Sequence, residues 1–250
     1  MFVKVNILAV NPFFDAYTGS DLLGKMIFLG LLLLSVATWV ILVYKIGMTG
    51  KAKNNSLRFG TLLKESKGNI LNLEYDEPDN FFLHPFCHLY QVLKTGTLDL
   101  LNKNRRFGKA LTEENTAKAS YLSHSDIDII RSHLSTTISL QIKQQEKNLF
   151  ILSTIVTLAP FLGLLGTVWG ILVTFSELQT QTGGNTNQMV IGGLSLALAT
   201  TVFGLIDAIP ALIGYNYLKS VIKDFHTEME CFSNEILASV EMQYRKVDVE

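Results

Sequence analysis

Three long apolar segments constrain this chain more than any other feature of its sequence. Residues 26–43, 149–175 and 189–217 contain one ionisable side chain between them, tyrosine aside, and it is Asp207. A helix needs about 20 consecutive apolar residues to cross the roughly 30 Å hydrocarbon core of a bilayer. We therefore predict an all-α membrane protein with three transmembrane helices, over 25–44, 149–175 and 189–217.

Positive charge is concentrated between the first and second apolar segments. Residues 45–148 hold 15 of the 21 Lys and Arg, and the tail 218–250 holds four more, whereas the loop 176–188 holds none. Lys and Arg are enriched on the cytoplasmic side of membrane proteins. We therefore expect a cytoplasmic domain over 45–148, a cytoplasmic helical tail over 218–250, and a periplasmic loop over 176–188. The N-terminus, 1–24, is expected on the outer side or at the membrane interface. In a Gram-negative cell the outer side is the periplasm, and the membrane is the inner membrane.

Two apolar stripes at helical spacing predict long helices outside the membrane. The first follows Ser125-x-x-Asp128, a pattern typical of a capping box, and reaches the second span without a breaker. It predicts one helix over 126–175, about 75 Å long at 1.5 Å per residue. Its members are Ile127, Ile130, Leu134, Ile138 and Ile142. The second stripe continues the third span through Leu218, Val221, Ile222, Phe225, Met229, Phe232, Ile236 and Val240. These helices are expected to bundle, either within one subunit or also between subunits.

The second and third spans are rich in small residues and each contains a proline. Gly166-x-x-x-Gly170 permits two helix backbones to approach closely. Helices of this composition are usually buried against other helices. We expect roles in helix packing for Gly163, Gly166, Gly170, Gly204, Pro160 and Pro210.

Asp207 is the one acid inside the predicted spans. A charge near the bilayer centre costs about 3 kcal/mol on insertion scales, so such an acid is a functional candidate by default. Thr200 lies seven residues earlier and about 20° away on a helix with 3.6 residues per turn. Two interpretations stay open. Asp207 either remains protonated or bonded to a neighbouring helix, or takes part in proton passage or in binding a partner helix.

Three sequence motifs resemble the MotA/TolQ/ExbB proton channel family, in particular its TolQ and ExbB subunits. The first is SVATWVILVYK at 35–45, in the first span. The second, APFLGLLGTVWG at 159–170, is close to the family's most characteristic motif. The third is GLIDAIPA at 204–211, followed by Tyr215 and Asn216. With the matching length and topology, the resemblance covers nearly the whole chain.

The resemblance implies an assembly, partners and pore residues. It implies a homo-oligomeric ring, expected to be a pentamer, around a single-span protein of the TolR/ExbD type that supplies a proton-carrying aspartate. It also implies a periplasm-spanning partner of the TolA/TonB type and contact with membrane lipid. Two pore threonines of the family correspond to Thr154 and Thr201, and we count Thr200 and Asp207 with them as candidate proton-pathway residues.

The chain departs from the family pattern at one point. Many members carry a glutamate where this chain has Leu196, and most carry a small or apolar residue where it has Asp207. The two positions lie on nearly the same side of a helix but about 16 Å apart along its axis. Whether Asp207 does the work of that glutamate is left open by the resemblance.

Other classes of function find less support in the sequence. The net charge of -1 gives no electrostatic reason to bind nucleic acid. His84-Pro-Phe-Cys-His88 lacks the paired spacing of a zinc site, and no hydrolase or nucleotide-binding motif occurs. We therefore expect neither an enzyme nor a metal or cofactor site.

The expected function is conversion of the proton-motive force into mechanical work, for envelope integrity or outer-membrane nutrient import. A secondary solute transporter and a membrane scaffold without ion flux are the alternatives.

Overall fold

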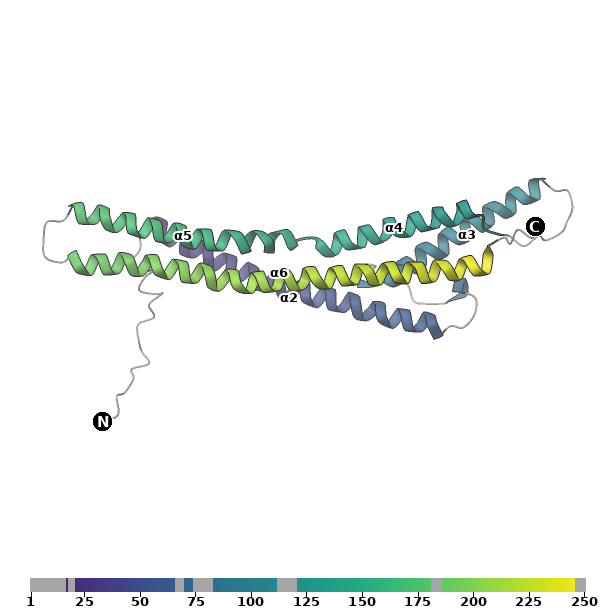
Figure 1. Cartoon of the computed structure of the whole chain (residues 1–250), viewed down its shortest axis with the longest axis horizontal. Helices are drawn as coiled ribbons and strands as arrows, with labels where there is room; N and C mark the ends of the chain where they lie inside the picture. The colour runs from purple at the N-terminus through teal and green to yellow at the C-terminus, as the bar shows by residue number, and fades with distance from the viewer. Residues whose placement is uncertain are drawn as a thin grey trace, which may run out of the picture. The chain divides into compact units, whose positions relative to one another are not determined.

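The protein is built from long α-helices. The computed structural model describes residue 17 and residues 21–65, 70–73, 83–111, 121–180 and 186–245. Most of the predicted segment 1–24 and part of the loop 176–188 therefore lie outside the described residues. The elements are α2 (Leu22–Glu65), a short 3-10 helix η1 (Ile70–Asn72), α3 (Pro85–Leu111), α4 (His124–Glu146), α5 (Leu149–Thr180) and α6 (Thr186–Tyr244) (Figure 1). Among the described residues there is no strand beyond an isolated bridge between Leu122 and Arg245. The predicted all-α class is confirmed.

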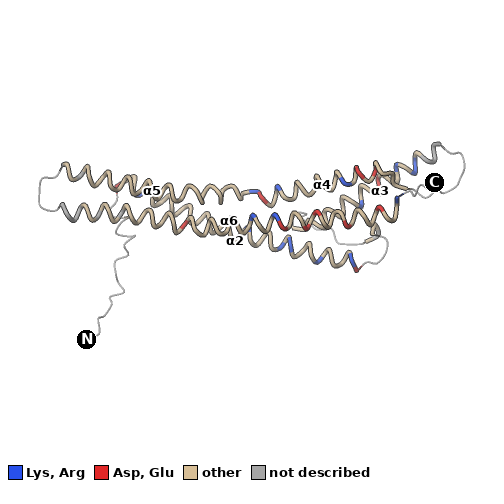
Figure 2. The backbone as a smooth tube through the Cα atoms, viewed as in Figure 1, with Lys and Arg blue, Asp and Glu red and all other residues tan. Residues whose placement is uncertain are grey.

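The chain divides into two compact units, each of which is described separately. The first, the apolar unit, comprises Met1–Tyr44 and Asn148–Tyr217, and the second, the polar unit, comprises Lys45–Lys147 and Leu218–Glu250. Figure 2 shows that Lys, Arg, Asp and Glu gather on the helices of the polar unit and are nearly absent from α5.

Helices of the apolar unit have the length and surface of membrane spans. Within the described residues, three helical stretches are long and apolar enough to cross a bilayer, in α2, in α4 with α5, and in α6. Large apolar side chains lie on their outer surfaces, such as Leu33 at 60% exposure, Phe161 at 68% and Ile213 at 65%. An exposed apolar surface of this extent marks contact with lipid or with another protein. The prediction of three membrane-competent helices is confirmed.

Glycines bring α5 and α6 into close antiparallel contact. A Cβ atom at Gly166 would lie 2.6 Å from the Cβ atom of Thr200, and one at Gly204 would lie 2.6 Å from the carbonyl oxygen of Ala159. Real Cβ atoms do not approach other atoms so closely, so any larger residue would push the helices apart. Gly163 and Gly170 lie in the same contact, and Pro160 and Pro210 lie inside α5 and α6.

The start of α2 is fixed by a polar contact within the apolar unit. The Asp21 carboxylate accepts hydrogen bonds from the Gly24 backbone N–H at 2.9 Å and from the Trp169 indole N–H of α5 at 2.8 Å. One turn further on, the rings of Phe28 and Phe203 meet edge to face at 6.1 Å, which joins α2 to α6. These contacts place α2 against both of the other spans.

The polar unit is a helical bundle with a continuous apolar core. The predicted stripes of α4 and of the second half of α6 are confirmed, because their members are buried or packed against this core, apart from the half-buried Val221. Aromatic rings of α3 and α6 stack at its centre, with Phe86 and Phe232 4.2 Å apart. The second half of α2 also lies in the core, although most of its buried residues are small or polar. They are Lys45, Thr49, Ala52, Ser56, Phe59 and Leu63.

The capping box at the start of α4 lies two residues before the predicted position. Ser123 is the N-cap, and its hydroxyl accepts a hydrogen bond from the Asp126 backbone N–H at 3.2 Å, while Asp126 Oδ2 accepts one from the Ser123 N–H at 2.9 Å. The Asn104 side chain of α3 also donates to Asp126, at 2.9 Å. Burial opposes ionisation of Asp126, but these hydrogen bonds outweigh it and hold its pKa below the usual value. The predicted partner, Asp128, instead pairs with Arg131 at 2.9 Å.

The predicted uninterrupted helix over 126–175 is wrong at one place. Lys147 and Asn148 separate α4 from α5, and Asn148 has a φ of 70°, which α-helical residues do not adopt. A helix that ends leaves its last carbonyl groups without partners in the helix. The buried Lys45 ammonium donates to one of them, the Gln145 carbonyl oxygen, at 2.9 Å. This positive group stabilises the negative end of the helix dipole and satisfies a backbone acceptor.

Candidate functional site

Thr154 lies on the outer face of α5. Its side chain is exposed, among large apolar neighbours such as Phe150 and Phe161. The hydroxyl donates to the Phe150 carbonyl oxygen one turn earlier, at 2.9 Å, and the Thr157 hydroxyl donates to the Thr154 carbonyl oxygen at 2.9 Å. The Thr154 and Thr157 hydroxyl groups therefore lie on an outer face of α5 that is mostly apolar.

Thr200 and Thr201 lie in the contact between α6 and α5. The half-buried Thr201 donates to the Gly163 carbonyl oxygen on α5 at 3.0 Å. Thr200 is buried, and its hydroxyl lies 2.8 Å from the Ala197 carbonyl oxygen and 3.4 Å from that of Gly163. The absence of a side chain at Gly163 and Gly166 makes room for both threonines.

The hydrogen-bond pattern limits what the threonine hydroxyls can offer to another molecule. A hydroxyl has one hydrogen atom and two acceptor lone pairs. Thr154 and Thr201 each direct that hydrogen at a backbone carbonyl oxygen. Each hydroxyl oxygen is then an acceptor. It suits a group that carries a proton, either a protonated carboxylic acid or a water molecule.

Asp207 lies away from the α5–α6 contact. Its side chain is 3% exposed and forms a hydrogen bond with the side chain of Thr38 on α2, which is fully buried. The structure therefore brings Thr200 and Thr201 together, leaves Thr154 on an outer face, and places Asp207 against a different helix. No role for Thr38 was predicted from the sequence. Its segment, 35–45, served only as a family motif, and the sequence does not show that the Thr38 hydroxyl is buried.

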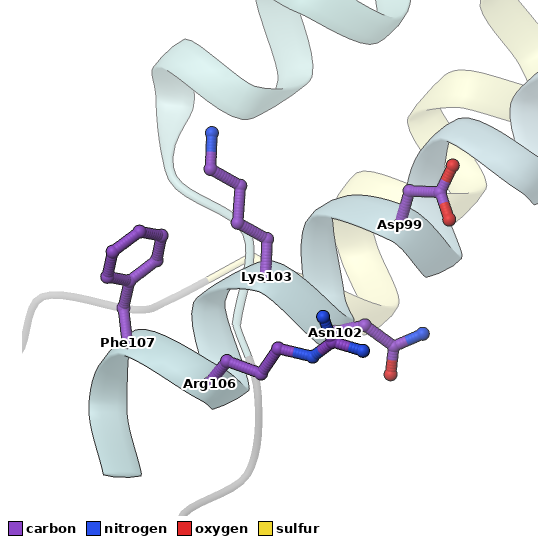
Figure 3. A pocket seen from close by; sticks show the side chains of 5 residues that line it. All are labelled: Asp99, Asn102, Lys103, Arg106 and Phe107. Carbon is purple, nitrogen blue, oxygen red and sulfur yellow. The ribbon is translucent and has the colours of Figure 1, made fainter. Parts of the chain in front are cut away.

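The described residues of the polar unit contribute no comparable site. A cavity of about 480 Å³ lies beside α3, and Figure 3 shows the side chains that line it. Those side chains are exposed, and they are Asp99, Asn102, Lys103, Arg106 and Phe107. His84 Nε2 lies 3.4 Å from the side-chain nitrogen of Asn55, and His88 Nδ1 lies 2.9 Å from that of Gln141. In the part of the chain that the structure describes, no group of three or more His, Cys, Asp and Glu side chains is arranged to hold a metal ion.

Three long apolar helices, packed through glycines and bearing a few polar groups, define a multi-pass helical membrane protein. A model of the MotA/TolQ/ExbB proton channel family matches residues 102–231, which is just over half of the chain. The chain belongs to this family.

Several curated relatives show which members the chain is similar to. It is 40% identical over 99 residues to the biopolymer transport protein ExbB of Aquifex aeolicus, covering 40% of this chain and 66% of that protein. It is 26% identical over 226 residues to ExbB of Pseudomonas putida, covering 90% of this chain and 62% of that protein. It is also 32% identical over 110 residues to the Tol-Pal system protein TolQ of Haemophilus influenzae, covering 44% of this chain and 48% of that protein. The chain thus spans less than two thirds of the length of these relatives.

Proposed function

We propose that the protein is a proton-channel subunit that converts the proton-motive force into mechanical work on a periplasm-spanning partner. The observation that carries this proposal is membership of a proton channel family, through a match that includes all of α4 and α5 and much of α6. One elementary charge that crosses 100 mV releases about 2.3 kcal/mol. Each proton can therefore shift a mechanical equilibrium of that size, in the service of envelope integrity or of nutrient import.

The proposed assembly is a homo-pentameric ring in the inner membrane, around a single-span partner of the TolR/ExbD type. A protein of the TolA/TonB type receives the work. In this assembly Thr154 and Thr201 face the partner, and their hydroxyl oxygens accept hydrogen bonds from its protonated carboxyl group or from water. The exposed apolar surfaces of α2 and α5 contact lipid or a neighbouring subunit.

The proposal is tested by proton flux. The full-length chain is reconstituted in lipid vesicles with the TolR/ExbD-type protein of the same organism, and a membrane potential drives protons toward a pH-sensitive dye in the lumen. We expect acidification with the intact partner, and background flux when the membrane aspartate of the partner is replaced by asparagine. Background flux with the intact partner would support the scaffold alternative, and flux without any partner would support a transporter.

The proposed orientation places the polar unit and the C-terminus in the cytoplasm and the loop 176–188 in the periplasm. Cysteines introduced at Gly183 and at Lys103, in a background with Cys87→Ser and Cys231→Ser, are expected to react with an impermeant maleimide from opposite sides of the inner membrane. Gly183 lies outside the described residues, and Lys103 is exposed on α3. Gly183→Cys should be labelled in intact spheroplasts and Lys103→Cys only after lysis. Labelling of both from one side would contradict a three-span topology.

A further inference from the structure

A buried carboxyl group lies at the contact between α2 and α6, apart from the threonines of α5 and α6. Asp207 is 3% exposed, and one of its carboxyl oxygens shares a hydrogen bond with the Thr38 hydroxyl. Within the described residues, the other oxygen, Oδ2, is buried and has no hydrogen-bond partner. The carboxyl group is thus enclosed by protein, and among the described residues Thr38 is its one hydrogen-bond partner.

The hydrogen bonds of Thr38 indicate which group supplies the proton of that contact. The Thr38 hydroxyl lies 2.9 Å from the Leu34 carbonyl oxygen, one turn earlier in α2. A carbonyl oxygen can only accept, so the single hydroxyl hydrogen of Thr38 is engaged there. The Thr38 oxygen then offers lone pairs alone to Asp207. With the Thr38 hydrogen directed at Leu34, the bond between the two side chains is made by a carboxylic acid that donates its own proton. In the other arrangement Thr38 turns its hydrogen to an ionised Asp207, and the stability of that arrangement depends on the charges nearby.

The opposite arrangement, an ionised Asp207 that accepts from Thr38, has no support from neighbouring charges. A buried carboxylate needs a countercharge or several donors, and here it would have one neutral donor. Lys25 is the one basic side chain among the described residues of the apolar unit, thirteen residues before Thr38 and roughly 20 Å away along the helix axis. Lys45, seven residues beyond Thr38 on α2, donates to the Gln145 carbonyl oxygen. Among the described residues of the unit the other acids are Asp21, which immediately precedes α2, and Glu177, near the end of α5.

We propose that Asp207 is a proton-binding site: it carries its proton against Thr38, and releases that proton to water only when the contact between α2 and α6 opens. Release leaves a carboxylate that water must solvate, so deprotonation and separation of the two helices accompany each other. The site lies on this chain and is distinct from the carboxyl group of the partner. The inference rests on the proposed function only for the use of the proton, because the protonated state follows from the local contacts.

Infrared spectroscopy tests the protonated state directly. The C=O stretching band of a protonated carboxylic acid is well separated from the bands of a carboxylate. The full-length chain, without partner, is measured in lipid bilayers at neutral pH, as wild type and with Asp207→Asn, Thr38→Val and, as a control, Asp128→Asn. Asp128 is an exposed acid paired with Arg131 in the polar unit.

We expect a carboxylic acid band in the wild-type protein that is lost in Asp207→Asn and unchanged in Asp128→Asn. In Thr38→Val the band should remain and move to higher frequency, because the acid loses its hydrogen-bond acceptor. Both substitutions nearly preserve side-chain volume, and the shift in Thr38→Val assigns the band even if Asp207→Asn fails to fold. No carboxylic acid band in the wild-type protein, or a band that persists in Asp207→Asn, would overturn the inference. Neither result would change the outcome of the proton-flux test, because that test measures flux that depends on the partner.

Discussion

Replacing Thr154 or Thr201 by valine should reduce partner-dependent proton flux by about ten- to a hundredfold while the protein still folds and assembles. Valine keeps the shape of threonine and removes the hydroxyl oxygen. The variant leaves the proton-carrying group of the partner without its acceptor. A buried donor left unsatisfied costs about 1–3 kcal/mol, and each 1.4 kcal/mol is about a factor of ten. The measurement is the vesicle flux assay with the intact partner. Complementation of a strain that lacks the gene is the parallel measurement in cells.

Thr136→Val is the matched control for this prediction. Thr136 is exposed on α4, and its hydroxyl donates to the Ser132 carbonyl oxygen one turn earlier at 2.9 Å, as that of Thr154 does to Phe150. It lies in the polar unit, so flux should be unchanged. If both membrane variants, expressed and assembled with the partner at normal levels, carried protons at the wild-type rate, the threonines would be packing residues. The proton route would then have to run through other groups.

The second large effect is expected from one added methyl group, in Gly204→Ala. The new Cβ atom would lie 2.6 Å from the Ala159 carbonyl oxygen and 3.2 Å from the Gly163 Cα atom. Both are backbone atoms, which no rotation of a side chain can move out of the way. Overpacking of a tight contact costs about 1–3 kcal/mol. We expect a clear fall in the temperature at which the purified protein unfolds in mild detergent, followed through the fluorescence of Trp39 and Trp169.

Gly30→Ala provides the same chemical change without the steric conflict. Gly30 lies inside α2 in the same unit, and a Cβ atom there would meet nothing within 4 Å. Alanine is favoured over glycine in a helix by about 1 kcal/mol, so this variant should be as stable as the wild type or slightly more so. Equal melting temperatures for the two variants would show that α5 and α6 do not pack as described.

Much of the fold could be predicted because membrane helices have a simple requirement. Twenty apolar residues without charge give a strong signal, and the three predicted spans lie within α2, α5 and α6. The stripes of α4 and α6 could be predicted because Ile, Leu and Phe recur at helical spacing. The role of the four candidate residues stays a prediction.

Other features could not be predicted, for reasons that can be named. The end of α4 depends on a left-handed backbone at Asn148 and on a lysine 100 residues earlier in the chain. The capping box was predicted two residues too late because Ser123 and Ser125 are each followed by an aspartate three residues later. Only the Ser123 pattern has an aspartate, Asp126, that also accepts a hydrogen bond from Asn104. The neighbours of Asp207 could not be predicted because a helical wheel gives the direction of a side chain but not which helix it meets. Thr200 meets α5, whereas Asp207, roughly 10 Å further along α6, meets α2.

The buried stripe of small and polar residues on α2 bears on how this part of the chain can evolve. Thr49, Ala52 and Ser56 are at most 1% exposed, in a core otherwise built from large aromatic and aliphatic side chains. Their small volume is what lets α2 approach that core. We therefore expect size to limit exchange at Ala52 and Ser56, where Ala, Ser and Thr should be tolerated and Leu should not. Thr49 also donates a hydrogen bond to Gln145 Oε1 at 3.4 Å. A reading of sequence variation by polarity alone would mistake this stripe for a solvated surface.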